Sequence, residues 1–321
     1  MKFRTEIIVP AAKYQISHSD KIMMLGSCFV ESISSKMLSA SFSINVNPFG
    51  IVYNPISIAN GLYDLMQSKM YAKEELFLSQ DVYHSFSHHS RFSGTDMESV
   101  LNAINETIFQ ASKFLQQANF LIITFGTANV YRLISSGKVV SNCHKLPAKL
   151  FREERLTVCF IVEQWNQLIQ DLKKLNPNLK ILFTVSPIRH WKNGANENQL
   201  NKSTLLLAIN ELVNANKNCS YFPSYEIMLD DLRDYRFYAE DMIHPNDLAI
   251  NYIWEKFSGS YFSKQTNDLI KEWESIQQIF NHKPFNPDSG AHKFFLEKGK
   301  KRKDEFLKNN PLFLSANTLT D

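Results

Sequence analysis

The sequence lacks the features that mark membrane, secreted and zinc-binding proteins. No apolar stretch approaches the ~20 residues that a transmembrane helix needs. The first residues carry no sustained apolar region followed by small residues, as a signal peptide would. The four cysteines are scattered, without the paired spacing of a zinc site. These absences predict a cytoplasmic protein with reduced thiols and no metal site.

Charge imbalance is also lacking. The chain has 35 basic and 32 acidic residues, a net charge of +3, so its composition predicts neither a nucleic-acid nor a membrane partner. The basic run at 298–303 is accordingly interpreted as a solvated helix face. No internal repeat or low-complexity segment is present. With 321 residues, 44% of them hydrophobic, the chain suits one large domain, or one domain with an appendage.

Three short apolar runs stand out, and each ends in a small residue. Residues 22–25 lead into Gly26-Ser27, residues 120–125 into Gly126, and residues 180–185 into Ser186. Unbroken apolar runs of this length are typical of strands buried on both faces. Segments with helical spacing lie between them, which predicts a parallel sheet covered by helices on both faces.

The remaining pattern completes the predicted order of elements. We expect further strands at 6–10, 41–46 and from 220, a hairpin at 130–134 and 139–143, and helices at 30–40, 57–66, 97–115, 159–175, 198–214 and 247–257. Residues 81–94, rich in His, Ser and Phe, are interpreted as a loop over a pocket. After residue 260 only helices are expected, at 265–280 and 292–308. This divides the chain into a domain at 1–260 and a helical extension at 261–321, packed on or beside it.

Ser27 lies at the predicted turn from the first strand into a helix. Ligands of parallel sheets sit outside the carboxyl ends of the strands. Backbone N–H groups at a helix N-terminus stabilise negative charge there, so a hydroxyl at this turn is well placed to act as a nucleophile. The alternative is that Ser27 is only the N-cap of the helix, a position that Ser favours.

A second motif, Asp241-Met-Ile-His244-Pro245, precedes the last helix of the predicted domain. An Asp and a His three residues apart can meet on one side of a turn, with roughly 5–6 Å between their Cβ atoms. The carboxylate then fixes the tautomer of the ring, and the other nitrogen is free to accept a proton from a hydroxyl. A solvent-exposed turn is the alternative interpretation.

The chain has a Ser after the first predicted strand and Asp-x-x-His before the last helix, an order that resembles the SGNH/GDSL hydrolase superfamily. The chain resembles its bacterial GSCFA branch in Gly26-Ser27-Cys28-Phe29 and in further blocks across residues 20–255. These blocks begin at Asn47, Thr124, Asn142, Ser186, Tyr221 and Asp234. The resemblance implies a three-layer, flavodoxin-like α/β fold.

The resemblance also implies roles for individual residues. Ser27 would be the nucleophile, His244 the general base and acid, and Asp241 the residue that orients His244. The superfamily's oxyanion hole uses the amide of the Ser, the amide of a Gly, here Gly50, and an Asn side chain two residues after a Gly.

The third oxyanion donor departs from the superfamily pattern. The block after the second buried strand is Gly126-Thr127-Ala128, with Ala in place of the Asn. Losing one such donor costs about 2.7–4 kcal/mol of transition-state stabilisation. We expect Thr127, Asn129 or another side chain to substitute, or the chemistry to be weak or altered.

Other residues near the predicted strand ends remain candidates. Cys28 is a rival nucleophile, because helix N-termini lower thiol pKa values. However, it starts the helix about 100° round from Ser27, so only one of the two can face His244. His144 is a candidate for lining the crevice, and Arg189 for binding an anionic substrate group. Cys143 and His144 have no recognisable third metal ligand nearby.

The function expected from the sequence is hydrolysis of an ester, or acyl transfer, through an acyl-enzyme at Ser27. It requires no cofactor, and the substrate would be a small-molecule or glycan ester. One alternative is a weak or inactive binding module of the same fold for an acylated or carbohydrate-type ligand. Another is a scaffold that binds a partner through the helical extension.

Overall fold

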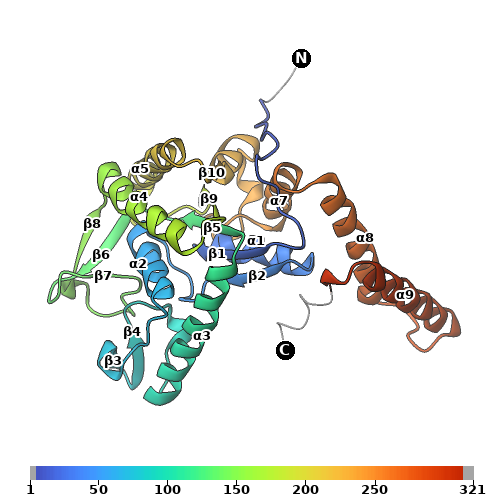
Figure 1. The fold of residues 1–321 in the computed structure, drawn as a ribbon, viewed down its shortest axis with the longest axis horizontal. Helices are drawn as coiled ribbons and strands as arrows, with labels where there is room; N and C mark the ends of the chain where they lie inside the picture. The colour runs from blue at the N-terminus through green and yellow to red at the C-terminus, as the bar shows by residue number, and fades with distance from the viewer. Residues whose placement is uncertain (1–4, 314–321) are drawn as a thin grey trace.

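The computed structural model describes residues 5–313, which contain a five-stranded parallel sheet in the order β10-β9-β5-β1-β2 (Figure 1). The strands are β1 (Lys21–Gly26), β2 (Ser43–Val46), β5 (Phe120–Phe125), β9 (Lys180–Val185) and β10 (Cys219–Phe222). If these five strands are numbered 1 to 5 in chain order, their order in the sheet from the β2 edge is 2-1-3-4-5. This is the flavodoxin-like order, so the predicted fold class is confirmed.

Helices cover both faces of this sheet. Successive residues of each strand point to opposite sides, so each strand contributes apolar side chains to both faces. Met23 packs in one core with α2, α3, α4 and α5, whereas its neighbours Ile22 and Met24 pack in another with α1 and α7. The helices have the bounds α1 (Cys28–Ser39), α2 (Pro55–Met66), α3 (Met97–Gln117), α4 (Val158–Leu175), α5 (Gly194–Ala215), α6 (Ser224–Glu226) and α7 (Asp247–Tyr261). None of the helices within residues 5–313 has the length and hydropathy needed to span a bilayer.

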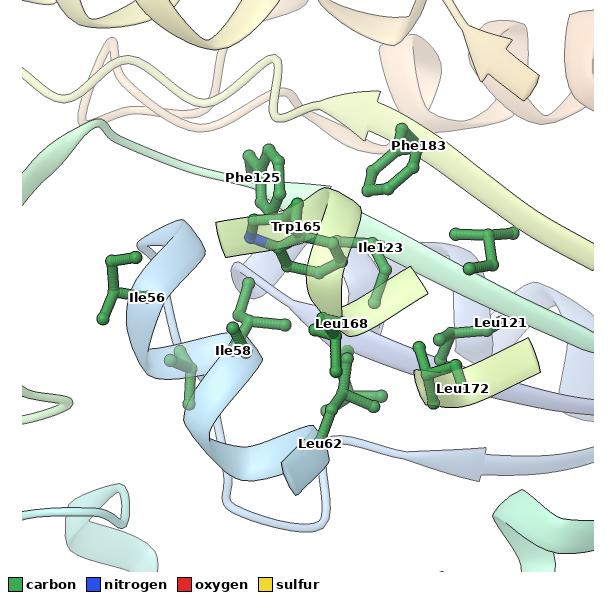
Figure 2. Close-up of a cluster of buried hydrophobic side chains, with 14 of the residues drawn as sticks. Ile56, Ile58, Leu62, Leu121, Ile123, Phe125, Trp165, Leu168, Leu172 and Phe183 are labelled. Carbon is green, nitrogen blue, oxygen red and sulfur yellow. The ribbon is translucent and has the colours of Figure 1, made fainter. Parts of the chain in front are cut away.

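Trp165 of α4 packs in the core that contains Met23 (Figure 2). The ring of Trp165 meets those of Phe125 and Phe183 edge-on, with centroids 5.0 and 5.3 Å away. Its indole N–H donates to the carbonyl oxygen of Pro55 at 3.2 Å, so the one polar atom of this buried side chain is satisfied. This packing holds the amino end of α2 and the carboxyl ends of β5 and β9 in fixed positions.

Two small antiparallel units lie beside the central sheet, on the side where Figure 1 shows α2. One is the sheet of β7 (Val139–Val140), β6 (Asn129–Leu133) and β8 (Phe151–Arg155), and the other is the hairpin of β3 (Leu76–Ser79) and β4 (Val82–Ser85). The predicted hairpin around 130–143 is confirmed, while β8 was not predicted.

The interpretation of 81–94 as a loop is wrong in its first part, which contains β4. Gln80 and Asp81 both have positive φ, 50° and 59°, and form a two-residue turn between β3 and β4. Such turns match the twist of a hairpin.

The predicted strand at 6–10 is absent. These residues instead contact the π-helical turn after α6 and helix α7: Ile7 N–H donates to the Asp231 carboxylate at 2.9 Å, and Lys256 donates to the Ile7 carbonyl at 3.0 Å. The segment is held by side chains and does not join a strand ladder.

Helices α8 (Lys264–Asn281) and α9 (Gly290–Asn309) form a hairpin that extends away from the sheet (Figure 1). Trp273 of α8 packs against Phe306 and Phe313, and its indole N–H donates to the Ser39 carbonyl at the end of α1, at 3.1 Å. We retain the division of the chain at residue 260 as a proposal. Residues 1–4 and 314–321, which belong to the two proposed domains, lie outside the described residues.

Candidate active site

Ser27 follows β1 directly and occupies the N-cap position of α1. A Cβ on the preceding Gly26, whose φ is +143°, would lie 2.2 Å from the Thr124 carbonyl oxygen, so only Gly fits this turn. The Ser27 side chain makes no capping hydrogen bond. Its Oγ is buried and, among residues 5–313, has no hydrogen-bond partner. A buried hydroxyl that neither caps nor bonds calls for a reason other than helix capping.

Ser27 lies at the point where the strand order reverses. Strands β1 and β5 are neighbours, and the residues that follow them are Ser27 and Gly126. A Cβ on Gly126 would lie 3.4 Å from the Cβ of Ser27. The two strand ends therefore converge, at the position where doubly wound sheets bind ligands.

Asp241 and His244 form a hydrogen-bonded pair in the turn before α7. One oxygen of Asp241, Oδ1, accepts the backbone N–H groups of Ile243 and His244, both at 2.9 Å. The other, Oδ2, lies 2.6 Å from Nδ1 of His244. The N–H of His244, then that of Ile243, lower the pKa of Asp241 to about 2, so its carboxylate is ionised at neutral pH.

This pairing sets the tautomer of His244. An ionised carboxylate is only an acceptor, so Nδ1 carries a hydrogen and Nε2 of the neutral ring is left as a proton acceptor. The side chain of His244 is 45% exposed, which leaves Nε2 accessible. The pair has the geometry of the base and orienting residue of a catalytic triad.

Arg189 contacts this turn through its backbone and its side chain. Its backbone N–H donates to the Ile243 carbonyl at 3.3 Å, and its guanidinium donates to the Met242 carbonyl. The guanidinium also lies 4.5 Å from the ring centroid of Tyr238. Met242 has a φ of +57°, a conformation uncommon for such a residue, and is fixed by these contacts. In this conformation Arg189 contacts the Asp241–His244 turn, and its binding of an anionic substrate group stays a prediction.

Ser27 and His244 make no hydrogen bond with each other, since Oγ of Ser27 has no partner in the described chain. The predicted oxyanion donors are also occupied. The N–H of Ser27 donates to the Thr124 carbonyl at 3.3 Å, and that of Gly50 donates to the Asn47 carbonyl at 2.7 Å. Gly50 is thus part of a turn, and its amide is not free in this conformation.

The side chains expected to replace the missing Asn are likewise engaged. Thr127 Oγ1 donates to Asn201 at 3.0 Å, and Asn129 Nδ2 donates to Glu153 at 3.2 Å. The backbone N–H groups of Gly126 and Thr127 both donate to the Tyr53 carbonyl, at 2.7 and 3.2 Å. Ala128 is fully buried in the core. The Thr127 hydroxyl and these backbone N–H groups are therefore not free donors in this conformation, whereas the NH₂ group of Asn129 carries a second hydrogen besides the one bonded to Glu153.

A cavity of about 670 Å³ is lined by the segments that follow β2, β5 and β9 and by residues of the β7-β6-β8 sheet. Its volume is in the range of small-molecule sites. Tyr53 and Thr127, which flank Gly126, line it; Ser27 and His244 do not. Its polar wall is formed by Asn129, Tyr131, Glu153, His190 and Lys192.

Charges on this wall are paired. Glu153 accepts from Asn193 at 2.7 Å as well as from Asn129, and lies 3.7 Å from Lys192. Lys192 donates to the Tyr131 hydroxyl, and this hydrogen bond raises the pKa of the lysine. The cavity thus presents one carboxylate and one ammonium that offset each other.

His144 does not line this cavity, contrary to the prediction. Its ring packs 4.5 Å from that of His84, and Nε2 lies 2.8 Å from the Ser85 carbonyl oxygen. Burial lowers the pKa of His144. The two preceding residues, Asn142 and Cys143, line the cavity instead. In the part of the chain that the structure describes, no three His, Cys, Asp or Glu side chains gather as a metal site would require.

Cys28 lies at the first position of α1, with Sγ 3.5 Å from the Tyr53 hydroxyl. It is partly exposed, and no hydrogen bond to His244 is present in residues 5–313. Its side chain is directed to Tyr53, at the edge of the cavity, and it remains a rival to Ser27 on geometry alone.

Three buried polar residues near the site were not predicted from the sequence. They lie on α5 and are Asn198, Asn201 and Lys202, each at most 4% exposed. Lys202 donates to the carbonyl oxygens of Gly126 and Ser186 at 2.7 and 2.8 Å. Burial lowers the pKa of Lys202 to about 7.

Some solved structures are similar to this chain at low identity. They include a family 3 carbohydrate esterase from Clostridium thermocellum, with 12% identity and a TM-score of 0.36, covering 78% of this chain and 97% of that one. A family 2 carbohydrate esterase with a carbohydrate-binding domain, from Corynascus thermopiles (Myceliophthora fergusii), has 13% identity, a TM-score of 0.39 and coverage of 83% and 69%. The acetyl xylan esterase Est2A from Butyrivibrio proteoclasticus has 12% identity, a TM-score of 0.37 and coverage of 76% and 64%. Similarity this low does not transfer a substrate to this chain.

Two family models match the sequence, in successive ranges. No curated protein matches the chain. The model of the GSCFA family matches residues 21–257, and that of the GSCFA domain protein, C-terminal domain, matches residues 273–317. The first match contains Ser27, the Asp241–His244 pair and all five strands of the central sheet. The chain belongs to the GSCFA family.

Proposed function

We propose that the protein is a serine esterase or acyltransferase that works through an acyl-enzyme at Ser27. The observation that carries this proposal is the 2.6 Å contact of Asp241 with Nδ1 of His244, which leaves Nε2 as a proton acceptor. It is supported by the place of Ser27 at the reversal point of the sheet, with a hydroxyl that serves no capping role.

In this mechanism Oγ of Ser27 attacks the ester carbonyl carbon while Nε2 of His244 takes the hydroxyl proton. The tetrahedral intermediate collapses, and the leaving alcohol receives that proton from Nε2. Water, or an acceptor alcohol, then loses a proton to Nε2 and attacks the acyl-enzyme, which releases the acid or the new ester and restores Ser27. The ionised Asp241 stabilises the imidazolium that forms twice in the cycle.

Ser27 must meet both His244 and a substrate for this reaction to run. Since its Oγ is buried and unpartnered in the described conformation, the side chain or the neighbouring turns must rearrange when substrate binds. Catalytic hydrogen bonds often form only in the substrate complex. The 670 Å³ cavity beside Gly126 is the space available for the group that the ester carries, a small molecule or a glycan.

One observation favours a second candidate, a binding module of the same fold. The amides of Ser27 and Gly50, expected to form the oxyanion hole, both donate to backbone carbonyls. If this conformation persists with ligand, the cavity binds an acylated or carbohydrate-type molecule without turning it over.

An esterase assay distinguishes the enzyme from the binding module. The purified full-length chain is incubated with p-nitrophenyl acetate, butyrate and octanoate. The esterase proposal predicts saturable release of p-nitrophenol with at least one of these acyl groups. Rates equal to those of heat-denatured protein with all three would contradict it. Thermal stabilisation by the same compounds without turnover would then favour the binding module.

A further inference from the structure

The first half of α5 carries a buried polar stripe where a helix of this fold would carry apolar residues. Asn198, Asn201 and Lys202 are spaced i, i+3, i+4, on one face of the helix. Further along α5 the buried residues are apolar: Leu205, Ala208, Ile209 and Leu212. The stripe interrupts a hydrophobic face at the end of the helix that lies near the strand ends.

Every member of the stripe bonds to a segment that follows β5 or β9. Asn198 Oδ1 accepts the backbone N–H of His190 at 2.9 Å, and Asn201 Oδ1 accepts the Thr127 hydroxyl at 3.0 Å. Lys202 joins the two segments, because Nζ donates to the carbonyl oxygen of Gly126, after β5, and of Ser186, after β9.

Lys202 is costly to bury. It is 1% exposed, and within residues 5–313 no carboxylate forms an ion pair with it. Lysine is almost never fully buried unless it is paired. Nearby groups that titrate are His190, whose pKa is lowered first by burial and then by the charge of Lys202, and Tyr225, whose ring centroid lies 5.5 Å from Nζ. A residue that served packing alone would be apolar at this position.

We infer that Lys202 is a positioning residue of the site, whose side chain ties the carboxyl ends of β5 and β9 together beside Ser27. Lys202 and Ser27 are linked through one residue, Gly126. The carbonyl oxygen of Gly126 accepts from Lys202, and its N–H donates to the Tyr53 carbonyl. With a Cβ on Gly126 only 3.4 Å from that of Ser27, movement of this segment changes the space around the nucleophile. The role in catalysis rests on the proposed function; the tie between the strands does not.

Lys202→Met tests the inference, with the exposed Lys173→Met on α4 as the matched control. We expect Lys202→Met to raise amide hydrogen-exchange rates at Gly126, Thr127 and Ser186 at least tenfold, since these amides are hydrogen-bonded in the segments that Lys202 holds. Amides of α3 should be unchanged. We also expect kcat for p-nitrophenyl acetate to fall at least tenfold with little change in KM, and Lys173→Met to match the wild type in both measurements.

The outcomes are distinguishable. Unchanged exchange at the three amides of a folded Lys202→Met would overturn the inference. A wild type without esterase activity would contradict the proposed function, while exchange still decides the role of Lys202. If Lys202→Met does not fold, the ¹³C chemical shifts of the Gly126 and Ser186 carbonyls are followed against pH in the wild type. The same titration in His190→Gln removes the nearby imidazole as a source of the shift. A common midpoint in both proteins supports the bridge, and carbonyls that do not titrate together overturn it.

Discussion

Replacing Ser27 with alanine is expected to lower kcat for p-nitrophenyl acetate by at least about 10⁴-fold, with the fold intact. Removing a triad nucleophile leaves only the catalysis that oxyanion stabilisation and binding provide. The fold should tolerate the change because Oγ of Ser27 makes no hydrogen bond, so no partner atom loses one. Urea unfolding should give a free energy within about 1 kcal/mol of the wild type.

Two variants of neighbouring residues control this measurement. Ser35→Ala, at an exposed position of α1, should keep wild-type kcat. Cys28→Ala removes the rival nucleophile and should also retain activity. Activity that survives Ser27→Ala but is lost in Cys28→Ala would transfer the role of nucleophile to the thiol.

Asp241→Asn is expected to lower kcat by about 10³–10⁴-fold. Its Oδ1 can still accept the N–H groups of Ile243 and His244, so the turn should persist. However, the carboxylate oxygen beside Nδ1 of His244 becomes an NH₂ group, which is a donor. The ring then presents Nδ1 as an acceptor and carries its hydrogen on Nε2, where it can no longer take the proton of Ser27.

The rate of p-nitrophenyl acetate hydrolysis, with circular dichroism as a check on folding, measures this effect. Glu240→Gln, an adjacent exposed carboxylate, removes the same charge without touching His244 and should stay within twofold of the wild type. If Asp241→Asn and Glu240→Gln have the same kcat, the Asp241–His244 pair has no catalytic role.

The parallel sheet could be predicted because its strands are unbroken apolar runs. β5 and β9 have the predicted bounds, residues 120–125 and 180–185, since each is buried on both faces and flanked by residues that break it. The predicted strand at 6–10 is absent because Ile7 and Val9 pack against the core that contains α1 and α7, without a neighbouring strand to pair with, and Ile8 is exposed. β8, Phe-Arg-Glu-Glu-Arg, was missed because three of its four charged residues are exposed and only its pairing with β6 makes it a strand.

Side-chain contacts within a few residues could be predicted, and side-chain contacts between distant segments could not. The Asp241–His244 bond follows from spacing alone and is present at 2.6 Å. By contrast, the orientations of Arg189 and His144 depend on the turn at 239–244 and the β3–β4 hairpin, which lie far away in sequence. The position of His244 relative to Ser27 depends on the packing of α1 against α7, which no local pattern encodes.

The polar stripe of α5 has a signal in the sequence. Asn198, Asn201 and Lys202 continue the helical spacing of Leu205, Ile209 and Leu212, so they were bound to share the buried face of the helix. Polar residues at buried positions of an amphipathic pattern have to find partners. The sequence of α5 therefore indicates that these three side chains have polar partners inside the protein.

Covalent labelling with a fluorophosphonate, followed by peptide mass mapping, tests the central claim most directly. Fluorophosphonates react with an activated serine hydroxyl and leave a stable adduct on the attacked residue. We predict one adduct on Ser27, absent in Ser27→Ala, retained in Cys28→Ala and formed far more slowly in His244→Ala. An adduct on any other residue, or none on the folded wild-type protein, would contradict the account.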